Sequence, residues 1–217
     1  MDDHLIVEPG TLAYAETHSS PQPAYLADVA ANTRAFSVSS GWLPEPVVGR
    51  FLAMLVGLTG ARRVLEIGTY TGYSALCVAE ALPDDGRIIT CEVDPDHARM
   101  AAEHIAGTPF RDRIEIRLGR GIKTIAALEG PFDLVHIDAE RTGYGAYLDA
   151  VLPKLGPGGF VVANSVLWKG RVLEPAHADA ETRAMSAFNE RIAADPSLEV
   201  VMLTIGEGLT IIRPRPD

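Results

Sequence analysis

The chain is poor in the features that mark secreted and membrane-bound proteins. It has two cysteines among 217 residues, Cys77 and Cys91, and neither belongs to a CxxC or metal-type spacing. No run approaches the roughly 18 apolar residues of a membrane span. The N-terminal segment MDDHLIVEPG is acidic, where a signal peptide would be basic. We therefore expect a cytoplasmic protein with two buried free thiols and no membrane partner.

Positive charge is also scarce. The chain carries 19 Lys and Arg against 29 Asp and Glu, a formal net charge of -10, and its basic residues do not cluster. Binding to a nucleic-acid backbone needs clustered Lys and Arg, so we expect no nucleic-acid partner and predict a small-molecule one. A length of 217 residues with 47% hydrophobic content suits one domain, residues 1–217, with one substantial core.

The hydrophobic pattern after residue 62 predicts the fold class. Short aliphatic runs alternate with amphipathic helical stretches, which is typical of βαβ units on a parallel sheet. The last two runs are joined by residues 205–208, too few for a crossover helix, so they should pair antiparallel. We predict an α/β, doubly wound, mostly parallel seven-stranded sheet with an antiparallel C-terminal hairpin. Its strands are expected at 63–67, 87–92, 114–118, 132–137, 159–163, 198–204 and 209–213, and its helices at 72–81, 95–106, 121–128, 144–155 and 182–194.

The first sixty residues differ from the rest. Helical stretches at 9–16, 23–35 and 46–58 are separated by Ser, Pro and Gly, which predicts a helical N-terminal cap over residues 1–60. The cofactor-binding core would then span 61–217. Residues 173–179, with Pro175 and two alanines, are the expected mobile loop.

The turn after the first predicted strand discriminates between cofactors. The segment from Glu66 has the pattern ExGxxxG, where a dinucleotide-binding turn requires GxGxxG. Tyr70 and Tyr73 would obstruct a pyrophosphate, which argues against a nicotinamide-dependent oxidoreductase. S-adenosylmethionine carries a sulfonium cation and an amino acid instead of phosphates, so the carboxylate of Glu66 favours that cofactor.

The second predicted strand ends at another acidic residue. Glu92 lies at the position where, in βαβ units, a carboxylate accepts hydrogen bonds from both ribose hydroxyls. Together with the glycine turn, it predicts a nucleoside-containing cofactor at the carboxyl edge of the sheet.

Four segments resemble the catechol and caffeoyl-CoA type O-methyltransferases, a class I, S-adenosylmethionine-dependent family with a Rossmann-like fold. They are VLEIGTYTGYS at 64–74, ITCEVDPD at 89–96, FDLVHIDAE at 132–140 and LGPGGFVVANSVLWKGRV at 155–172, and the likeness runs from about 41 to 213. The resemblance implies a homodimer, with Trp168 and Arg171 near the substrate mouth. It assigns the methionine end of the cofactor to Glu66, Gly68, Tyr73 and Ser74, the ribose to Glu92, the adenine to Gly119, Arg120 and Gly121, and the sulfonium to Asp138.

The chain departs from this family where a metal would bind. Most members hold a divalent cation with Asp at positions 138 and 164 and Asn at 165, and a Lys at 141 assists proton removal. This chain has Asp138, Arg141, Asn164 and Ser165. An amide in place of a carboxylate removes negative charge from a site for a hard cation. We therefore expect a weakened magnesium site at Asp138 and Asn164.

The candidate catalytic residues are Asp138, Arg141 and His136. Arginine stays protonated and cannot be a general base, so Arg141 is expected to bind an anion of the substrate. His136 lies two residues before Asp138 on the same strand, and hence on the same face, which makes it a possible replacement base. The alternative is a buried structural histidine paired with a neighbouring polar group.

These observations predict an S-adenosylmethionine-dependent O-methyltransferase. A substrate hydroxyl oxygen would attack the methyl group in line, and the protein would contribute mainly proximity and orientation. The acceptor is a small molecule or an acyl group bound to an acyl-carrier protein. Two alternatives stay open: a catechol or phenolic O-methyltransferase with a weakened metal site, and a non-catalytic protein that binds the cofactor.

Overall fold

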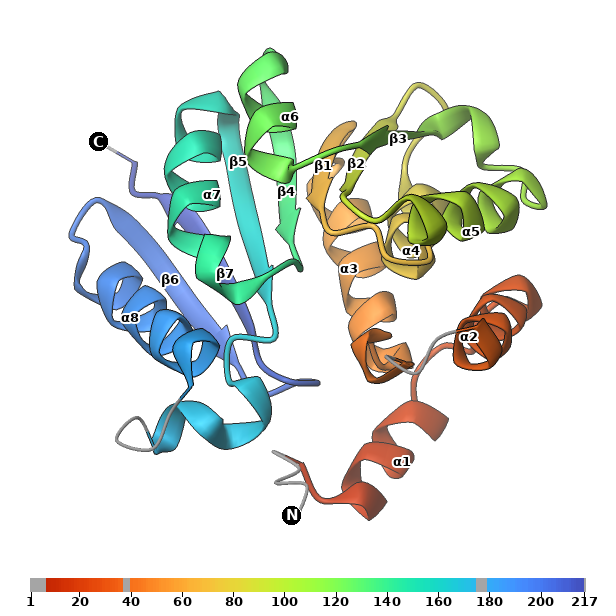
Figure 1. Cartoon of the computed structure of the whole chain (residues 1–217), viewed down its shortest axis with the longest axis horizontal. Helices are drawn as coiled ribbons and strands as arrows, with labels where there is room; N and C mark the ends of the chain where they lie inside the picture. Colours follow the sequence, from red (N-terminus) through yellow and green to blue (C-terminus); the bar gives the residue numbers. More distant parts are fainter. Residues whose placement is uncertain (1–6, 37–39, 175–178, 217) are drawn as a thin grey trace.

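A seven-stranded mixed sheet forms the centre of the molecule (Figure 1). The structure is a computed structural model that describes residues 7–36, 40–174 and 179–216. The strand order is β3-β2-β1-β4-β5-β7-β6; β1 to β5 run parallel, and β7 is antiparallel to both β5 and β6. The predicted fold class is therefore confirmed. The strands are β1 Arg63–Ile67, β2 Arg87–Glu92, β3 Ile114–Leu118, β4 Phe132–Ile137, β5 Leu155–Asn164, β6 Leu198–Leu203 and β7 Leu209–Pro214.

Helices cover both faces of the sheet, as a doubly wound fold requires. One hydrophobic cluster joins α6, α7 and α8 to the strands, and separate clusters join α3 to the sheet and α2 to α4 and α5. The helices are α1 Pro9–Thr17, α2 Ala24–Phe36, α3 Pro46–Thr59, α4 Tyr73–Ala81, α5 Pro95–Ala106, α6 Gly121–Ala127, α7 Tyr144–Val151 and α8 Ala180–Ala194.

The predicted helix at 144–155 is too long. Helix α7 ends at Val151, and the 3-10 helix Leu152–Lys154 follows it before β5 begins at Leu155. Pro153 explains the difference, because proline has no amide hydrogen and its ring clashes with the preceding turn of an α-helix.

Three helices occur in the N-terminal segment, close to the predicted ranges. Helix α1 has no buried residue and lies at the lower edge of Figure 1, away from the sheet, whereas α2 buries Leu26 and Val29. Helix α3 begins directly after Glu45 and leads into β1. Of the loop expected at 173–179, residues 175–178 lie outside the described residues.

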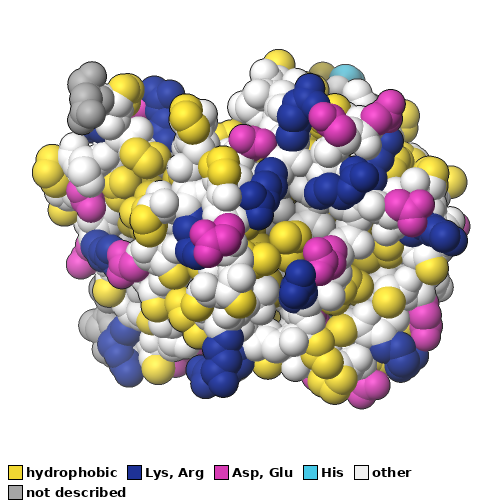
Figure 2. Space-filling model, turned by 90° about the horizontal axis from the view of Figure 1, so that it is seen from above, with side chains coloured by type: hydrophobic (Ala, Val, Ile, Leu, Met, Phe, Trp, Pro, Cys, Tyr) yellow, Lys and Arg dark blue, Asp and Glu magenta, His cyan; other side chains and the backbone are white. Residues whose placement is uncertain are grey.

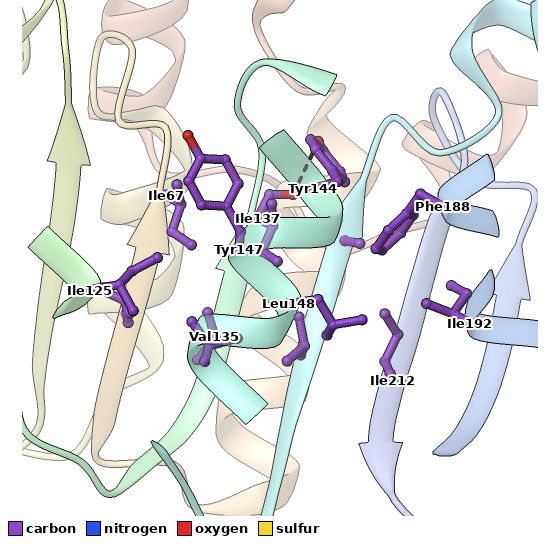
Figure 3. Packing of buried hydrophobic residues seen from close by; sticks show 14 of the residues in the cluster. Ile67, Ile125, Val135, Ile137, Tyr144, Tyr147, Leu148, Phe188, Ile192 and Ile212 are labelled. Carbon is purple, nitrogen blue, oxygen red and sulfur yellow. Dashed lines mark hydrogen bonds between the residues drawn. The ribbon is translucent and has the colours of Figure 1, made fainter. Parts of the chain in front are cut away.

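The core beside α7 fixes the carboxyl ends of β4 and β5. Tyr144 is fully buried and packs edge-on against Phe188 (Figure 3). Its hydroxyl donates a hydrogen bond of 2.9 Å to the carbonyl oxygen of Asn164. Ile67 and Ile137 belong to the same cluster. The ends of β1, β4 and β5 are therefore held by one packed region, which gives rigid support to the residues that follow them.

The surface chemistry agrees with the composition. On the face shown in Figure 2, basic and acidic side chains are interspersed, unlike the clustered cations of a phosphate-binding surface. Cys77 and Cys91 are buried free thiols, as expected. Within the described ranges, no helix combines the length and apolar character needed to cross a membrane.

Candidate active site

A cavity of about 560 Å³ lies at the carboxyl ends of the parallel strands, where open α/β sheets bind ligands. Most of the residues predicted for the site meet there: Gly68, Tyr73, Ser74, Glu92, Gly119, Gly121, Asp138, Arg141 and Asn164. Trp168 and Arg171, expected near the substrate mouth, also line it. Three predicted residues lie outside the lining, namely Glu66, Arg120 and His136.

The turn between β1 and α4 brings two backbone segments into close contact. Gly68 has φ +103°, and a Cβ atom on it would lie 1.8 Å from the carbonyl oxygen of Asp138. The amides of Gly68 and Thr69 both donate to the carbonyl of Cys91, at 3.0 and 3.1 Å. Only glycine fits here, because it combines a positive φ with the absence of a side chain. The turn therefore lies directly on the backbone that follows β4.

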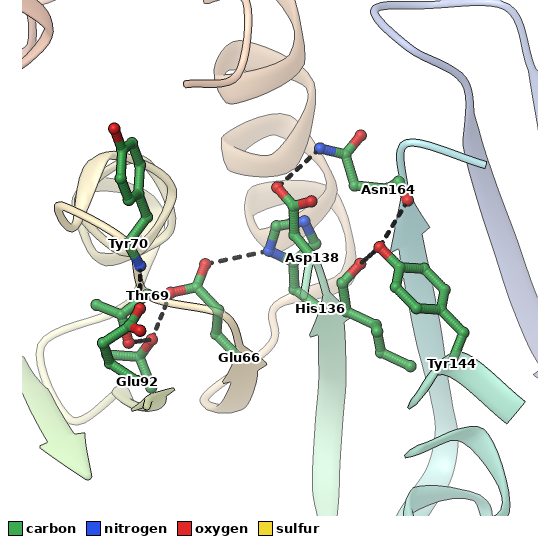
Figure 4. Close-up of polar contacts among 10 residues, drawn as sticks. Glu66, Thr69, Tyr70, Glu92, His136, Asp138, Tyr144 and Asn164 are labelled. Atoms are coloured by element: carbon green, nitrogen blue, oxygen red, sulfur yellow. Dashed lines mark hydrogen bonds and ion pairs between the residues drawn. The ribbon is translucent and has the colours of Figure 1, made fainter. Parts of the chain in front are cut away.

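Glu92 is held by three backbone amides at the end of β2. One carboxylate oxygen accepts from the amide of Tyr70 at 2.7 Å (Figure 4). The other accepts from the amides of Val93 and Asp94 at 2.8 and 2.9 Å. The side chain lines the cavity with 7% of its residue surface exposed. A carboxylate has about four acceptor positions, so with three taken by amides about one is left for a hydroxyl group of a ligand.

An aromatic group beside Glu92 was not predicted from the sequence. Trp42, Tyr70 and His97 all line the cavity, with ring centroids 5.7 Å apart for Trp42 and Tyr70 and 4.8 Å apart for Tyr70 and His97. They come from the N-terminal segment, the β1–α4 turn and α5, so no local pattern connects them. Their edge-to-face contacts form a partly apolar wall near the carboxylate.

Glu66 and His136 lie beneath the cavity and pair with each other. Their side chains are 0% exposed, and the Nδ1 atom of His136 lies 3.1 Å from Oε1 of Glu66 (Figure 4). The other oxygen of Glu66 accepts a 2.6 Å hydrogen bond from the Thr90 hydroxyl. Burial lowers the pKa of His136, but the hydrogen bond and charge of Glu66 outweigh it and raise the pKa above the ordinary 6.5. This geometry favours the structural alternative for His136 and gives Glu66 no contact with the cavity.

Asp138 and Asn164 form a pair on the cavity wall. The amide nitrogen of Asn164 donates a 3.0 Å hydrogen bond to Oδ2 of Asp138 (Figure 4). Burial raises the pKa of Asp138, although His136 and Asn164 oppose the shift. Asn164 is 5% exposed, and its Oδ1 atom has no hydrogen-bond partner among the described residues. The pair thus includes a nearly buried amide oxygen that has no partner among the described residues.

Arg141 stacks on Trp168 in the same cavity. The guanidinium carbon lies 3.2 Å from the indole centroid, and Nη1 lies 3.9 Å from the carboxylate of Glu181. The Arg141 side chain is 13% exposed, and its Nε atom has no partner in the part of the chain that the structure describes. A guanidinium held against an aromatic ring is restricted in its motion and can bind an anion.

Five charged residues that were not predicted for the site also line the cavity: Glu45, Glu140, Lys169, Glu181 and Glu207. Glu45, Lys169 and Glu207 come from the start of α3, the segment after β5 and the β6–β7 turn. Because these segments are remote in sequence, composition and spacing gave no signal for them.

The comparisons with known proteins identify the family. Residues 16–215 match the model of the O-methyltransferase family. The chain belongs to the O-methyltransferase family. This methyltransferase is 35% identical over 163 residues to catechol O-methyltransferase of Niastella koreensis, covering 73% of this chain and 74% of the relative. It is 33% identical over 177 residues to caffeoyl-CoA O-methyltransferase of Mesembryanthemum crystallinum, covering 76% and 70%. The predicted resemblance and class of enzyme are thereby confirmed.

Solved structures of other methyltransferases share the fold. TomG of Streptomyces achromogenes, an O-methyltransferase involved in tomaymycin synthesis and solved in complex with SAM, superposes with a TM-score of 0.86 at 28% identity, over 95% of this chain and 96% of its own. The O-methyltransferase of Bacillus cereus in complex with SAH gives the same TM-score and identity, over 95% and 97%. The first of these structures therefore holds the methyl donor, and the second holds its demethylated product.

Proposed function

We propose that this methyltransferase transfers the methyl group of S-adenosylmethionine to a hydroxyl of a small molecule or of a carrier-bound acyl group. The arrangement of Glu92 carries the proposal: a carboxylate fixed by three amides at the end of β2, which lines the cavity together with the glycine turn after β1. It suits a ribose, and the SAM- and SAH-bound structures of similar proteins support the same cofactor. Gly68, Tyr73 and Ser74 would border its methionine end.

The reaction is an in-line displacement at the methyl carbon. The acceptor oxygen forms a bond to that carbon as the carbon–sulfur bond breaks, and the bonding electrons leave with S-adenosylhomocysteine. The hydroxyl proton passes to a carboxylate of the cavity or to water. Asp138 places negative charge near the sulfonium, and Arg141 binds an anionic group of the acceptor. The protein's main contribution is proximity and orientation.

The residues present do not fit the divalent cation of related enzymes. Asn164 directs an N–H group at Asp138, so one carboxylate oxygen already has a partner. The guanidinium of Arg141 adds positive charge to the same cavity. Among the residues that the structure describes, no group of three or more His, Cys, Asp or Glu side chains is arranged to hold a metal ion. Since magnesium prefers several anionic oxygens, we propose that transfer proceeds without a tightly bound cation.

Calorimetric titration with SAM and SAH tests both proposals, with magnesium and again after chelation. We expect the same dissociation constants in both conditions, and methyl transfer that persists in EDTA across a panel of carboxylated and carrier-bound hydroxyl compounds. The matched variant is Asn164→Asp, which restores a carboxylate and should strengthen manganese binding measured by calorimetry without any acceptor. Loss of turnover in EDTA would contradict the metal-free reaction. SAH binding without turnover on any acceptor would support a non-catalytic protein that binds the cofactor.

Replacing Glu92 with glutamine should weaken SAH binding about a hundredfold, as loss of charged hydrogen bonds does. Glutamine keeps the size and shape of the side chain. Its NH₂ group is a donor, however, and would face backbone N–H donors that a carboxylate oxygen now accepts. Asp94→Asn is the matched control, because Asp94 also accepts backbone amides but caps helix α5 outside the cavity. An affinity unchanged in Glu92→Gln would remove the ribose from this position.

A further inference from the structure

Three charged residues line one part of the cavity: Glu45, Lys169 and Glu207. Nζ of Lys169 lies 3.7 Å from the carboxylate of Glu207. A Cβ atom on Gly206 would lie 2.7 Å from Oε2 of Glu45, so the Glu45 carboxylate rests against the backbone next to Glu207. All three side chains line the cavity. The β6–β7 turn and the start of α3 thus bring two carboxylates to one part of its wall.

The pKa values of Glu45 and Glu207 are raised, because nearby positive charge does not offset the burial of the two carboxylates. Glu45 is the N-cap residue of α3, yet its side chain accepts no amide of that helix. Burial raises the pKa of Glu45, and Asp138 raises it further while Lys169 lowers it. Burial also raises the pKa of Glu207, where Lys169 lowers it and Glu45 raises it. Lys169 thus lowers the pKa of both carboxylates and Arg141 lowers that of Glu207, yet both values stay raised. Carboxylates removed from water are costly without sufficient counter-charge.

A separate observation indicates that the ligand supplies hydrogen-bond donors. Oδ1 of Asn164 is an acceptor in the same cavity, on a residue 5% exposed, without a partner in the described ranges. A buried acceptor of this kind is normally satisfied, so a donor from the bound ligand is its natural partner. The cavity near Asp138 thus offers several acceptors to a ligand.

We propose that the acceptor carries a protonated amino group, which Glu45 and Glu207 bind. The inference rests on the proposed function and narrows it. With Arg141 available for an anion in the same cavity, the acceptor is a small hydroxylated molecule with both an amine and an acidic group, such as a hydroxylated amino acid. A malonyl-type acyl group on a carrier protein has no such amine. The competing interpretation is that Lys169 neutralises both carboxylates and the acceptor is uncharged there.

Two probes that differ by one amino group test this in the SAH-saturated enzyme. They are 3,4-dihydroxyphenylalanine and 3-(3,4-dihydroxyphenyl)propionate, whose dissociation constants are measured by calorimetry. The aminated probe should bind about tenfold more tightly, as one charged hydrogen-bonded contact does. Glu45→Gln and Glu207→Gln should each reduce this preference severalfold, and the double variant should abolish it. Lys169→Gln should have the opposite effect and strengthen binding of the aminated probe.

The matched control is Glu129→Gln, an exposed carboxylate that does not line the cavity and should leave the preference unchanged. Equal binding of the two probes, binding of neither, or a preference that survives in the double variant would overturn the inference. Titration with SAH in every variant distinguishes failure of this inference from failure of the proposed function. Enzyme that binds SAH without preferring the amine contradicts only this inference, whereas wild-type enzyme that binds neither SAM nor SAH contradicts the proposed function itself.

Discussion

Gly68→Ala should abolish measurable SAH binding and lower the free energy of unfolding by about 4 kcal/mol or more, the range of the most damaging substitutions. The added Cβ atom would lie 1.8 Å from the carbonyl oxygen of Asp138 and 2.7 Å from its carbonyl carbon. Both are backbone atoms, so no side-chain rotation relieves the clash. Either the β1–α4 turn or the segment after β4 must move, and both line the cavity.

Gly158→Ala separates the steric clash from backbone strain. Gly158 also has a positive φ, +75°, but nothing lies within 4 Å of its added Cβ. Its cost should be about 1 to 2 kcal/mol, the penalty of a left-handed residue alone, with SAH affinity unchanged. Denaturant unfolding and calorimetry on both variants give the comparison. If Gly68→Ala were as mild as Gly158→Ala, the close approach of the two segments would be wrong.

Glu66→Gln should destabilise the fold by about 3 to 5 kcal/mol, as the loss of one partner of a buried ion pair does. His136 would keep its buried position without a carboxylate. We expect SAH affinity to change less than threefold, because Glu66 does not line the cavity. Denaturant unfolding measures the first quantity and calorimetry the second. An affinity loss as large as that of Glu92→Gln would instead support the predicted contact of Glu66 with the methionine end.

The pH dependence of unfolding gives an independent check on this pair. Glu66 raises the pKa of His136 above 6.5 in the folded protein. A raised histidine pKa contributes stability that is complete below pH 6.5 and is lost as the pH rises through the folded value. The difference in unfolding free energy between wild type and Glu66→Gln should therefore shrink above pH 6.5. The double variant Glu66→Gln, His136→Gln completes a mutant cycle, and a coupling energy near zero would exclude the ion pair.

Local pattern was sufficient for most of the fold and part of the site. Hydrophobic periodicity is a property of neighbouring residues, so it located β1, β2 and β4 to the residue. The glycine turn and the acidic residue at the end of a strand are also local patterns. The sequence therefore predicted Gly68 and Glu92, and both line the cavity. The predicted helix at 144–155 did not take account of Pro153, although proline is a local signal that ends an α-helix.

Tertiary structure decided where the polar side chains lie. Both faces of a parallel sheet are covered, so alternation along β1 does not tell which layer Glu66 enters. Strand register places it directly opposite Thr90 on one side and His136 on the other, and this row of polar groups is buried. The sequence by itself determined the family, the order of the elements and most of the predicted residues that line the cavity. Only the folded chain brought Glu45, Lys169 and Glu207 together, because contacts between residues so distant in sequence depend on packing rather than on any local pattern.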